Sequence, residues 1–534
     1  MESLKLTNEQ IEILNEDIEK NKVIKVIAFA GTGKTTTLVE YAKHHSNYNF
    51  LYIAFNKSVQ LEAEKRFPKN VLAKTSHSLA WKQYGQKYKD KLVAKLRLNT
   101  VKNVLNLENY RDAKIISDIL NKFLTSPDEK FSLKHKPWLQ KDEEKRLKQY
   151  FKSAAKLWVK MIDPNDNEVG MLHDGYLKLY QLSKPKLGYD CILLDEAQDT
   201  NPVVSDIVLS QSCAKILVGD PHQQIYGFRG ACDAMDGIDA DKIFYLTYSF
   251  RFGEEIAWLA NKLLRLFKFE KNSLKGKLKI QSENMDIDMA IISRTNAMVF
   301  SKAATYYSQN KIAFLGGIEG YAFDDIVDTY WLYSDQNSKI RNPFFKSFKN
   351  YSKLKEFADE SDDLEVKNKM RIVEEYREQI PILVEYIKDS AVEIDKADLI
   401  LTTAHKAKGS QFTTVKISDD FLDLFPDDEL INPFTVDPEE FNLLYVTVTR
   451  AKRAIEFEDT KWFRFIHHDE SEGMESIESF FTNRMSMNEI VTHENVNSSD
   501  IDSFNNNEYN GLAIKNASIS RYFPTINQNG DILF

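Results

Sequence analysis

The 534-residue chain has few cysteines, no long apolar run and no visible export signal. No stretch approaches the roughly 20 apolar residues that a membrane-spanning helix needs, so we expect no membrane partner. The first nine residues lack the basic-then-apolar pattern of a secretion signal. The three cysteines, Cys191, Cys213 and Cys232, show no paired metal-ligand spacing. We therefore expect an intracellular protein, nuclear if the source is eukaryotic and otherwise cytoplasmic.

An excess of positive charge is also missing, because 71 Lys and Arg stand against 80 Asp and Glu, for a formal net charge of −9. Such a chain is a poor indiscriminate binder of polyanions, although a local groove can still be basic. Nucleic-acid binding must therefore be argued from particular sites. No repeat of solenoid period is visible. The length predicts roughly three or four domains, since one hydrophobic core rarely organises so many residues.

The most informative segment is AFAGTGKT at 28–35, an apolar strand that runs into a glycine loop ending in Lys-Thr. A glycine-rich turn lets backbone N–H groups surround phosphate oxygens, and the helix that follows points its positive dipole end at them. Lys34 is expected to reach the β- and γ-phosphates of a nucleotide, and Thr35 to offer its hydroxyl to Mg²⁺. The expected phosphate-binding residues are Ala28, Phe29, Ala30, Gly31, Thr32, Gly33, Lys34, Thr35 and Thr36.

A second motif, DEAQD at 195–199, follows the apolar run 191–194. This run predicts a buried strand, so Asp195 should stand at a strand end and face the same Mg²⁺ as Thr35. Glu196 is then placed to polarise a water molecule. A Gly-Lys-Thr triplet alone also occurs in ordinary strand–loop–helix turns, but an acidic partner on its own strand makes that alternative much weaker. Together the two motifs predict nucleotide hydrolysis.

Strand and helix patterns alternate along two parts of the chain. The first part has the βαβαβ order of a parallel sheet, and the second part repeats an α/β alternation. The first strands are expected at 23–29, 50–55, 71–75, 190–194 and 215–218, and those of a second lobe at 243–246, 289–293, 399–403, 414–417 and 454–457.

Blocks of helical pattern interrupt both lobes, and the composition turns polar and acidic near the end. The final block contains too few apolar residues to bury a core, which predicts a disordered tail. The expected domains are lobe one at 1–84 and 173–240 with a helical insertion at 85–172, lobe two at 241–322 and 397–465 with a helical insertion at 323–396, and the tail at 466–534.

Seven further motifs follow in a fixed order. They are TSHSL at 75–79, HDGYLKLYQLSKP at 173–185, VGDPHQQIYGFRGA at 218–231, YSFRFG at 248–253, SRTNA at 293–297, TAHKAKG at 403–409 and NLLYVTVTRA at 442–451. From about residue 6 to about residue 453, the ordered set resembles the UvrD/Rep branch of superfamily 1 helicases, and most closely the F-box DNA helicase family. The resemblance implies an α/β fold of two RecA-like P-loop NTPase lobes, each with a mainly helical insertion, plus a flexible C-terminal tail.

The resemblance also implies an activity. It is that of an ATP- and Mg²⁺-dependent DNA helicase and single-stranded DNA translocase with 3′-to-5′ polarity. The expected substrates are single-stranded DNA and forked or tailed duplex DNA. The expected setting is recombination, repair or the replication fork, where removal of recombinase filaments is a role found among relatives.

The resemblance assigns further residues to the nucleotide site. Gln10 matches the Q motif, whose amide can pair with adenine, although alone it would read as a surface glutamine. Gln223 is expected to sense the γ-phosphate. Arg251 and Arg450 match two arginine fingers on the second lobe, with a surface salt bridge as the alternative for each. Phe250, in place of the usual tyrosine, would stack on adenine. The expected catalytic residues are Lys34, Thr35, Asp195, Glu196, Gln223, Arg251 and Arg450.

Further features of the sequence depart from the family pattern. Gln411 stands where the family usually has a glutamate that contacts ribose or couples to DNA, so nucleotide selectivity or coupling is expected to differ. Thr36 stands where many UvrD-type enzymes carry an arginine that stacks on adenine. Gln10 lies so near the start that we expect no preceding F-box and no recruitment of a ubiquitin ligase.

DNA contacts are expected on the opposite face, across both lobes. Aromatic side chains there can stack on unpaired bases of any sequence, and polar ones can bind phosphate or sugar. Core packing is the alternative for each aromatic. The expected DNA contacts are Phe55, Asn56, Lys57, Thr75, His77, Tyr226, Phe228, Arg229, Thr403 and His405.

The tail carries a short pattern of its own. Asn516, Ile519, Tyr522 and Phe523 have the spacing of a sliding-clamp binding peptide, with Asn in place of the ideal Gln. The alternative is a tail segment that folds back onto the core. The whole chain has two rival functional interpretations. A helicase-nuclease is disfavoured because no spaced Asp and Glu-x-Lys cluster follows residue 453, and an ATPase-dead, clamp-tethered binding module is disfavoured because the catalytic residues are intact.

Overall fold

The computed structural model describes residues 5–227, 235, 237–278 and 288–468, together with the backbone of a short antiparallel pair, β16 (Thr525–Ile526) and β17 (Ile532–Leu533). Two expected DNA contacts, Phe228 and Arg229, lie outside the described residues. So do the four residues of the expected clamp peptide. Within the described ranges, no helix combines the length and the apolarity needed to cross a membrane.

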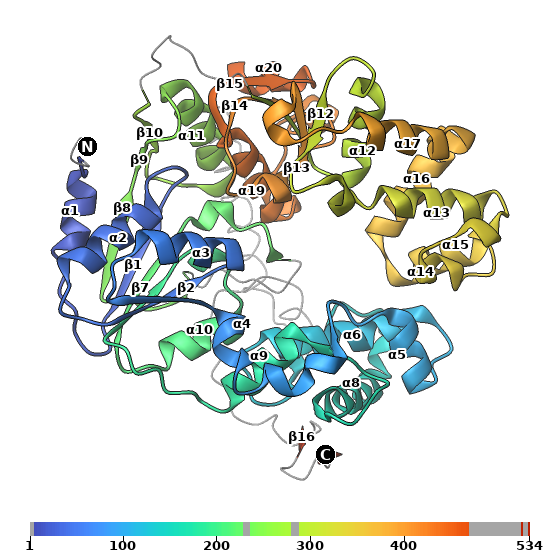
Figure 1. Ribbon diagram of the computed structural model, residues 1–534, viewed down its shortest axis with the longest axis horizontal. Helices are drawn as coiled ribbons and strands as arrows, with labels where there is room; N and C mark the ends of the chain where they lie inside the picture. Colours follow the sequence, from blue (N-terminus) through green and yellow to red (C-terminus); the bar gives the residue numbers. More distant parts are fainter. Residues whose placement is uncertain are drawn as a thin grey trace, which may run out of the picture.

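Lobe one is built on a six-stranded, wholly parallel sheet with the order β3-β2-β6-β7-β1-β8 (Figure 1). Helices cover both faces, so its strands carry apolar side chains in both directions. In β2, for example, Leu51 and Ile53 pack into one core and Phe50 and Tyr52 into the other. The strands are β1 (Val23–Ala28), β2 (Phe50–Ala54), β3 (Val71–Thr75), β6 (Cys191–Leu194), β7 (Ala214–Gly219) and β8 (Lys242–Leu246).

Except for α1, which precedes β1, the helices of lobe one lie after strands in the chain. A polar residue at or just after the strand end caps α3 and α4, namely Asn56 and Thr75. The helices are α1 (Asn8–Leu14), α2 (Lys34–His44), α3 (Lys57–Arg66), α4 (Ser76–Trp81), α9 (His173–Leu182) and α10 (Pro202–Leu209).

The prediction that the strand at 243–246 belongs to lobe two is wrong. β8 pairs in parallel with β1, Ile24 opposite Lys242 and Ala28 opposite Leu246, and forms the edge of the lobe-one sheet. Its outward side chains include Ile243, which is 51% exposed. The strand pattern identified the element, but the pairing partner depends on where the chain crosses between lobes, and that crossing follows β8.

Lobe two contains a five-stranded, wholly parallel sheet with the order β12-β13-β11-β14-β15, which confirms the expected second α/β lobe. β12 was absent from the prediction. The strands are β11 (Met289–Ser293), β12 (Ile312–Phe314), β13 (Leu399–Thr403), β14 (Phe412–Ile417) and β15 (Ala451–Phe457), and the helices are α11 (Glu254–Lys268), α12 (Asn296–Tyr306), α18 (Ala404–Ala407), α19 (Pro438–Val448) and α20 (Lys461–His467). A short parallel pair of strands, β9 (Tyr248–Ser249) and β10 (Lys275–Gly276), precedes this sheet in the chain.

Each lobe carries a mainly helical insertion, and the two insertions touch. The Tyr110 N–H donates to Glu360 Oε2 at 3.0 Å, and the Tyr110 ring packs edge-on against Phe357. In Figure 1 both insertions lie on the same side of the two lobes. The first contains β4 (Leu92–Val93), α5 (Leu98–Leu105), α6 (Tyr110–Thr125), α7 (Lys141–Glu144), α8 (Leu147–Ile162) and β5 (Met171–Leu172), and the second contains α13 (Phe323–Tyr333), α14 (Pro343–Lys346), α15 (Tyr351–Ser361), α16 (Leu364–Tyr376) and α17 (Ile380–Ser390).

Candidate nucleotide site and nucleic-acid face

The glycine loop joins β1 to α2 in a conformation that suits phosphate binding. Gly31 and Gly33 both have left-handed φ angles, 76° and 83°. A Cβ on Gly31 would lie 2.4 Å from Ser249 Oγ. The loop backbone therefore passes too close to the segment around Ser249 for residue 31 to carry a side chain. Gly33 is the N-cap residue of α2 and supplies no side-chain cap. The first N–H groups of α2 are therefore available to an anion.

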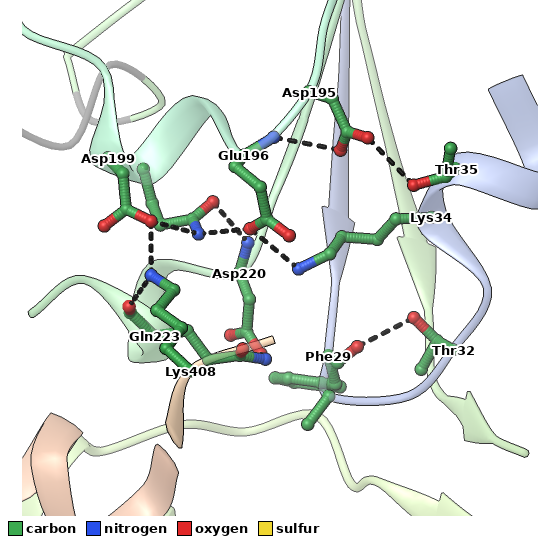
Figure 2. A network of polar contacts seen from close by, with 12 residues as sticks. Phe29, Thr32, Lys34, Thr35, Asp195, Glu196, Asp199, Asp220, Gln223 and Lys408 are labelled. Atoms are coloured by element: carbon green, nitrogen blue, oxygen red, sulfur yellow. Dashed lines mark hydrogen bonds and ion pairs between the residues drawn. The ribbon is translucent and has the colours of Figure 1, made fainter. Parts of the chain in front are cut away.

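Two acidic residues at the end of β6 meet the loop (Figure 2). Thr35 Oγ1 donates to Asp195 Oδ2 at 2.9 Å, and Lys34 Nζ lies 3.1 Å from Glu196 Oε2. Glu196 has a φ of 50°, a left-handed conformation that is uncommon outside glycine. Tyr52, which the sequence analysis did not single out, donates its buried hydroxyl to the same Asp195 oxygen at 2.7 Å.

The pKa values of the two adjacent carboxyl groups are shifted in opposite directions. Burial, reinforced by the neighbouring charge of Glu196, raises the pKa of Asp195. Burial would also raise the pKa of Glu196, but the ammonium groups of Lys34 and Lys408 outweigh it and hold that pKa below its ordinary value. The carboxylates in turn raise the pKa of Lys34 against the effect of its burial. The Lys34 ammonium thus favours the ionised form of Glu196, and a cation bound beside Asp195 would oppose the effect of burial on the pKa of that carboxyl group.

This donor set fits Mg²⁺ bound together with a nucleotide. Within the described ranges, no group of three or more His, Cys, Asp or Glu side chains could hold a metal ion by itself. Mg²⁺ is usually held by one or two carboxylates, with substrate phosphates and water completing the octahedron. Thr35 and Asp195 supply a hydroxyl and a carboxylate at hydrogen-bond distance from each other.

Two arginines lie on the other side of the site. Arg450 is 1% exposed, and its Nη2 lies 3.5 Å from Gln223 Oε1. Arg251 Nη1 donates to the Thr449 carbonyl at 2.9 Å. Burial lowers the pKa of both guanidinium groups, and for Arg450 the charge of Arg251 adds to the effect. Neither makes an ion pair with a carboxylate in the described part of the chain, so a bound polyphosphate would relieve the cost of burying this charge.

Asp220 and Tyr445 were also missed, although both stand inside motifs quoted above. The Tyr445 hydroxyl donates to Asp220 Oδ2 at 3.2 Å and accepts from the Ala30 N–H at 3.1 Å. Gln223 Nε2 donates to Asp220 Oδ2. These contacts join α19 of lobe two directly to the glycine loop of lobe one. Long-range pairing of this kind leaves no signal in a single sequence.

The expected adenine-binding residues lie together beside the loop. A Cβ on Gly33 would lie 3.3 Å from Gln10 Nε2 and 3.9 Å from the Phe250 ring, so these side chains flank the same glycine. Gln10 also caps its own helix, accepting from the Thr7 N–H at 3.0 Å. Phe250 is 44% exposed, which leaves a ring face for stacking.

The structure shows the surroundings of two positions that depart from the family pattern, Thr36 and Gln411. Arg66 of α3 donates from Nη2 to Thr36 Oγ1 at 2.9 Å. A guanidinium therefore contacts Thr36 from a neighbouring helix. Gln411 is exposed immediately before β14.

The expected DNA contacts occur at strand ends of both lobes. The Phe55 ring, 42% exposed, stacks on Tyr226 with centroids 5.6 Å apart and planes 18° apart. The Tyr226 hydroxyl donates to the His405 carbonyl of lobe two at 3.2 Å. His77 Nε2 lies 3.5 Å from Asp174 Oδ1, and Lys57 Nζ donates to a glutamine at the next turn of α3. Asn56, Thr75 and Thr403 cap α3, α4 and α18.

Lobe one supplies a phosphate loop and an acidic strand end, and lobe two supplies buried arginines to the same site. Two parallel sheets arranged in this way define a two-lobed P-loop NTPase. Comparison with known families agrees with the sequence resemblance. Residues 6–236 match the UvrD/REP helicase N-terminal domain, and residues 261–457 match the UvrD-like helicase C-terminal domain. The chain belongs to the UvrD-like helicase family.

Curated proteins that are similar to this chain include three named helicases. F-box DNA helicase 1 of Gallus gallus is 39% identical over 85% of this chain and 49% of its own length. F-box DNA helicase protein 1 of Schizosaccharomyces pombe is 32% identical over 85% of this chain and 57% of its own. The mitochondrial ATP-dependent DNA helicase HMI1 of Saccharomyces cerevisiae is 27% identical over 49% of this chain and 40% of its own. This chain thus spans about half the length of the F-box relatives.

Proposed function

We propose that the chain is an ATP-dependent DNA helicase that moves 3′-to-5′ along single-stranded DNA and is stimulated by it. The observation that carries this proposal is that lobe two reaches the phosphate site of lobe one, because Arg450 Nη2 lies 3.5 Å from Gln223 Oε1 and the Tyr445 hydroxyl accepts from the Ala30 N–H of the glycine loop. A site shared between two lobes can convert the loss of a phosphate into relative movement of the lobes.

Each residue has a defined task in hydrolysis. Thr35 and Asp195 would hold Mg²⁺, which supplies charge neutralisation on the transferred phosphoryl group when bound. The ionised Glu196 orients the attacking water and accepts its proton. Arg251 and Arg450 stabilise the charge that grows on the phosphoryl oxygens.

In this proposal the chain binds single-stranded DNA without sequence specificity. The Phe55–Tyr226 stack offers aromatic faces to unpaired bases, and every base has a face that can stack. The Tyr226 hydroxyl donates to the His405 carbonyl of lobe two, so this lobe-one side chain contacts both lobes. Lobe movement therefore changes the site at which a base is held, which is the requirement for stepping.

The finer assignments come from the family resemblance and from the pattern in the tail. Two relatives are named F-box DNA helicases and a third an ATP-dependent DNA helicase. We propose action in recombination or replication-fork repair, including removal of recombinase filaments, with Asn516, Ile519, Tyr522 and Phe523 as a sliding-clamp peptide. Clamp pull-down with Tyr522→Ala and Phe523→Ala tests the peptide, and unchanged clamp binding would end that part of the proposal.

ATP turnover measured with and without single-stranded DNA tests the main proposal. Lys34→Ala should lower turnover by roughly a hundredfold or more, because it removes a cation aimed at the phosphates. Lys43→Ala is the matched control, since Lys43 lies exposed on the same helix and pairs with Glu40. Absence of stimulation by DNA would refute the motor assignment. Unwinding only from 5′-tailed duplexes would refute the polarity.

A further inference from the structure

Lys408 lies where the nucleotide site meets lobe two. It follows α18 directly, and its ammonium group donates to Asp199 Oδ2 and to the backbone carbonyl of Gln223, both on lobe one (Figure 2). The side chains of Lys408 and Asp199 are both almost completely buried. One ammonium from lobe two is therefore held by two oxygen atoms of lobe one.

The same ammonium also faces the DNA-contact aromatics. Lys408 Nζ lies 5.2 Å from the centroid of the Tyr226 ring, within the range of a cation–π contact. Tyr226 stacks on Phe55 and bonds to the His405 carbonyl. Lys408 is thus in contact with the expected γ-phosphate sensor and with the expected base-stacking pair at once.

The burial of this group makes its partners interdependent. A buried ammonium that loses its carboxylate, or a buried carboxylate that loses its ammonium, is strongly disfavoured. A shift of the Gln223 segment or an opening of the lobes must therefore move Lys408 or expose the pair to water. Either change alters the position or the hydration of the ammonium group that lies 5.2 Å from the centroid of the Tyr226 ring. The chain of contacts from Gln223 through Lys408 to Tyr226 consists of direct contacts only.

We propose that Lys408 is a positioning residue that makes the Phe55–Tyr226 stack respond to the nucleotide state. This inference rests on the proposed function, because it assumes that Gln223 senses the nucleotide and that the stack holds DNA. The rival reading is that Lys408 merely holds the two lobes together. The two readings differ in one quantity, the ratio of DNA affinities in two nucleotide states.

The chain provides a matched control two residues away. Lys406 lies on α18 itself, and its ammonium lies 3.4 Å from the centroid of the Tyr321 ring, within lobe two. Lys406→Met removes the same charge from the same short segment. Lys408→Met removes the contacts to lobe one as well. Asp199→Asn breaks the ion pair from the other lobe.

The experiment measures the affinity of the full chain for a fluorescent oligo-dT, first with ADP and then with a non-hydrolysable ATP analogue. The ratio of the two dissociation constants is the coupling factor, which is commonly about 5- to 150-fold in allosteric proteins. We expect Lys408→Met and Asp199→Asn each to bring the ratio within about twofold of one, whereas Lys406→Met keeps the wild-type ratio. The double variant should lose nothing further, because both changes break one interaction.

The outcomes separate the two proposals. A wild-type ATPase that single-stranded DNA does not stimulate would refute the proposed function. A wild-type ratio that persists in Lys408→Met would overturn the inference and leave the proposed function standing. Weaker oligo-dT binding by the same factor in both nucleotide states would also overturn it, because that is the result of a merely structural role.

Discussion

Acidification is expected to loosen the first helical insertion through His135. This side chain is almost completely buried between α6 and the following loop. Its Nδ1 accepts from the Ser132 N–H at 2.9 Å, and its Nε2 lies 2.9 Å from Ser126 Oγ. An accepting Nδ1 carries no proton, so the ring is neutral in the folded insertion.

Burial lowers the pKa of His135 to about 4, against the opposing effect of the Asp128 carboxylate and with the aid of the Lys178, Lys122 and Lys134 ammonium groups. The ordinary value in an unfolded chain is about 6.5. Between these values the unfolded chain binds a proton that the folded insertion does not, so stability falls as the pH falls. The loss is about 2 kcal/mol at pH 5 and about 3 kcal/mol near pH 4.

Hydrogen exchange of the α6 and α8 amides between pH 7 and pH 5, corrected for the intrinsic rate, measures this local stability. His135→Gln can keep both hydrogen bonds but takes up no proton. We expect it to lose about 2 kcal/mol less than the wild type over this pH interval. The exposed His44→Gln is the matched control. Equal losses in wild type and His135→Gln would refute the reasoning.

Two further substitutions test the geometry of the nucleotide site. Gly31→Ala should weaken the binding of a fluorescent ATP analogue by roughly tenfold or more, because left-handed backbone costs a side chain about 1–2 kcal/mol and the added Cβ would meet Ser249. Gly188→Ala, with no atom within 4 Å of the added Cβ, should bind normally, and equal effects would contradict the account. Tyr52→Phe removes a donor to a carboxylate and should cost about 1.5–3 kcal/mol of stability, whereas Tyr41→Phe, whose hydroxyl donates to a neutral carbonyl at 2.8 Å, should cost about 0.5–1.5 kcal/mol. Thermal unfolding that ranks the two tyrosine variants in the opposite order would contradict this prediction.

The motifs predicted the class of fold and the family because their physics is local. A glycine loop between a strand and a helix, followed by an acidic strand end, needs only neighbouring residues to be recognised. The strand patterns likewise predicted the strands of both parallel sheets except β12, which has only three residues, but they assigned the strand at 243–246 to the wrong lobe.

Tertiary structure decided which distant residues meet. β8 has the pattern of any half-exposed strand, and only its pairing with β1 assigned it to lobe one. Arg66 donates to Thr36 from another helix, a contact between residues 30 positions apart that no motif indicated. Lys408 meets Asp199 although 209 residues separate them along the chain. The sequence by itself determined the chemistry of each motif, and folding decided the contacts between motifs, because those depend on how two separately built sheets pack together.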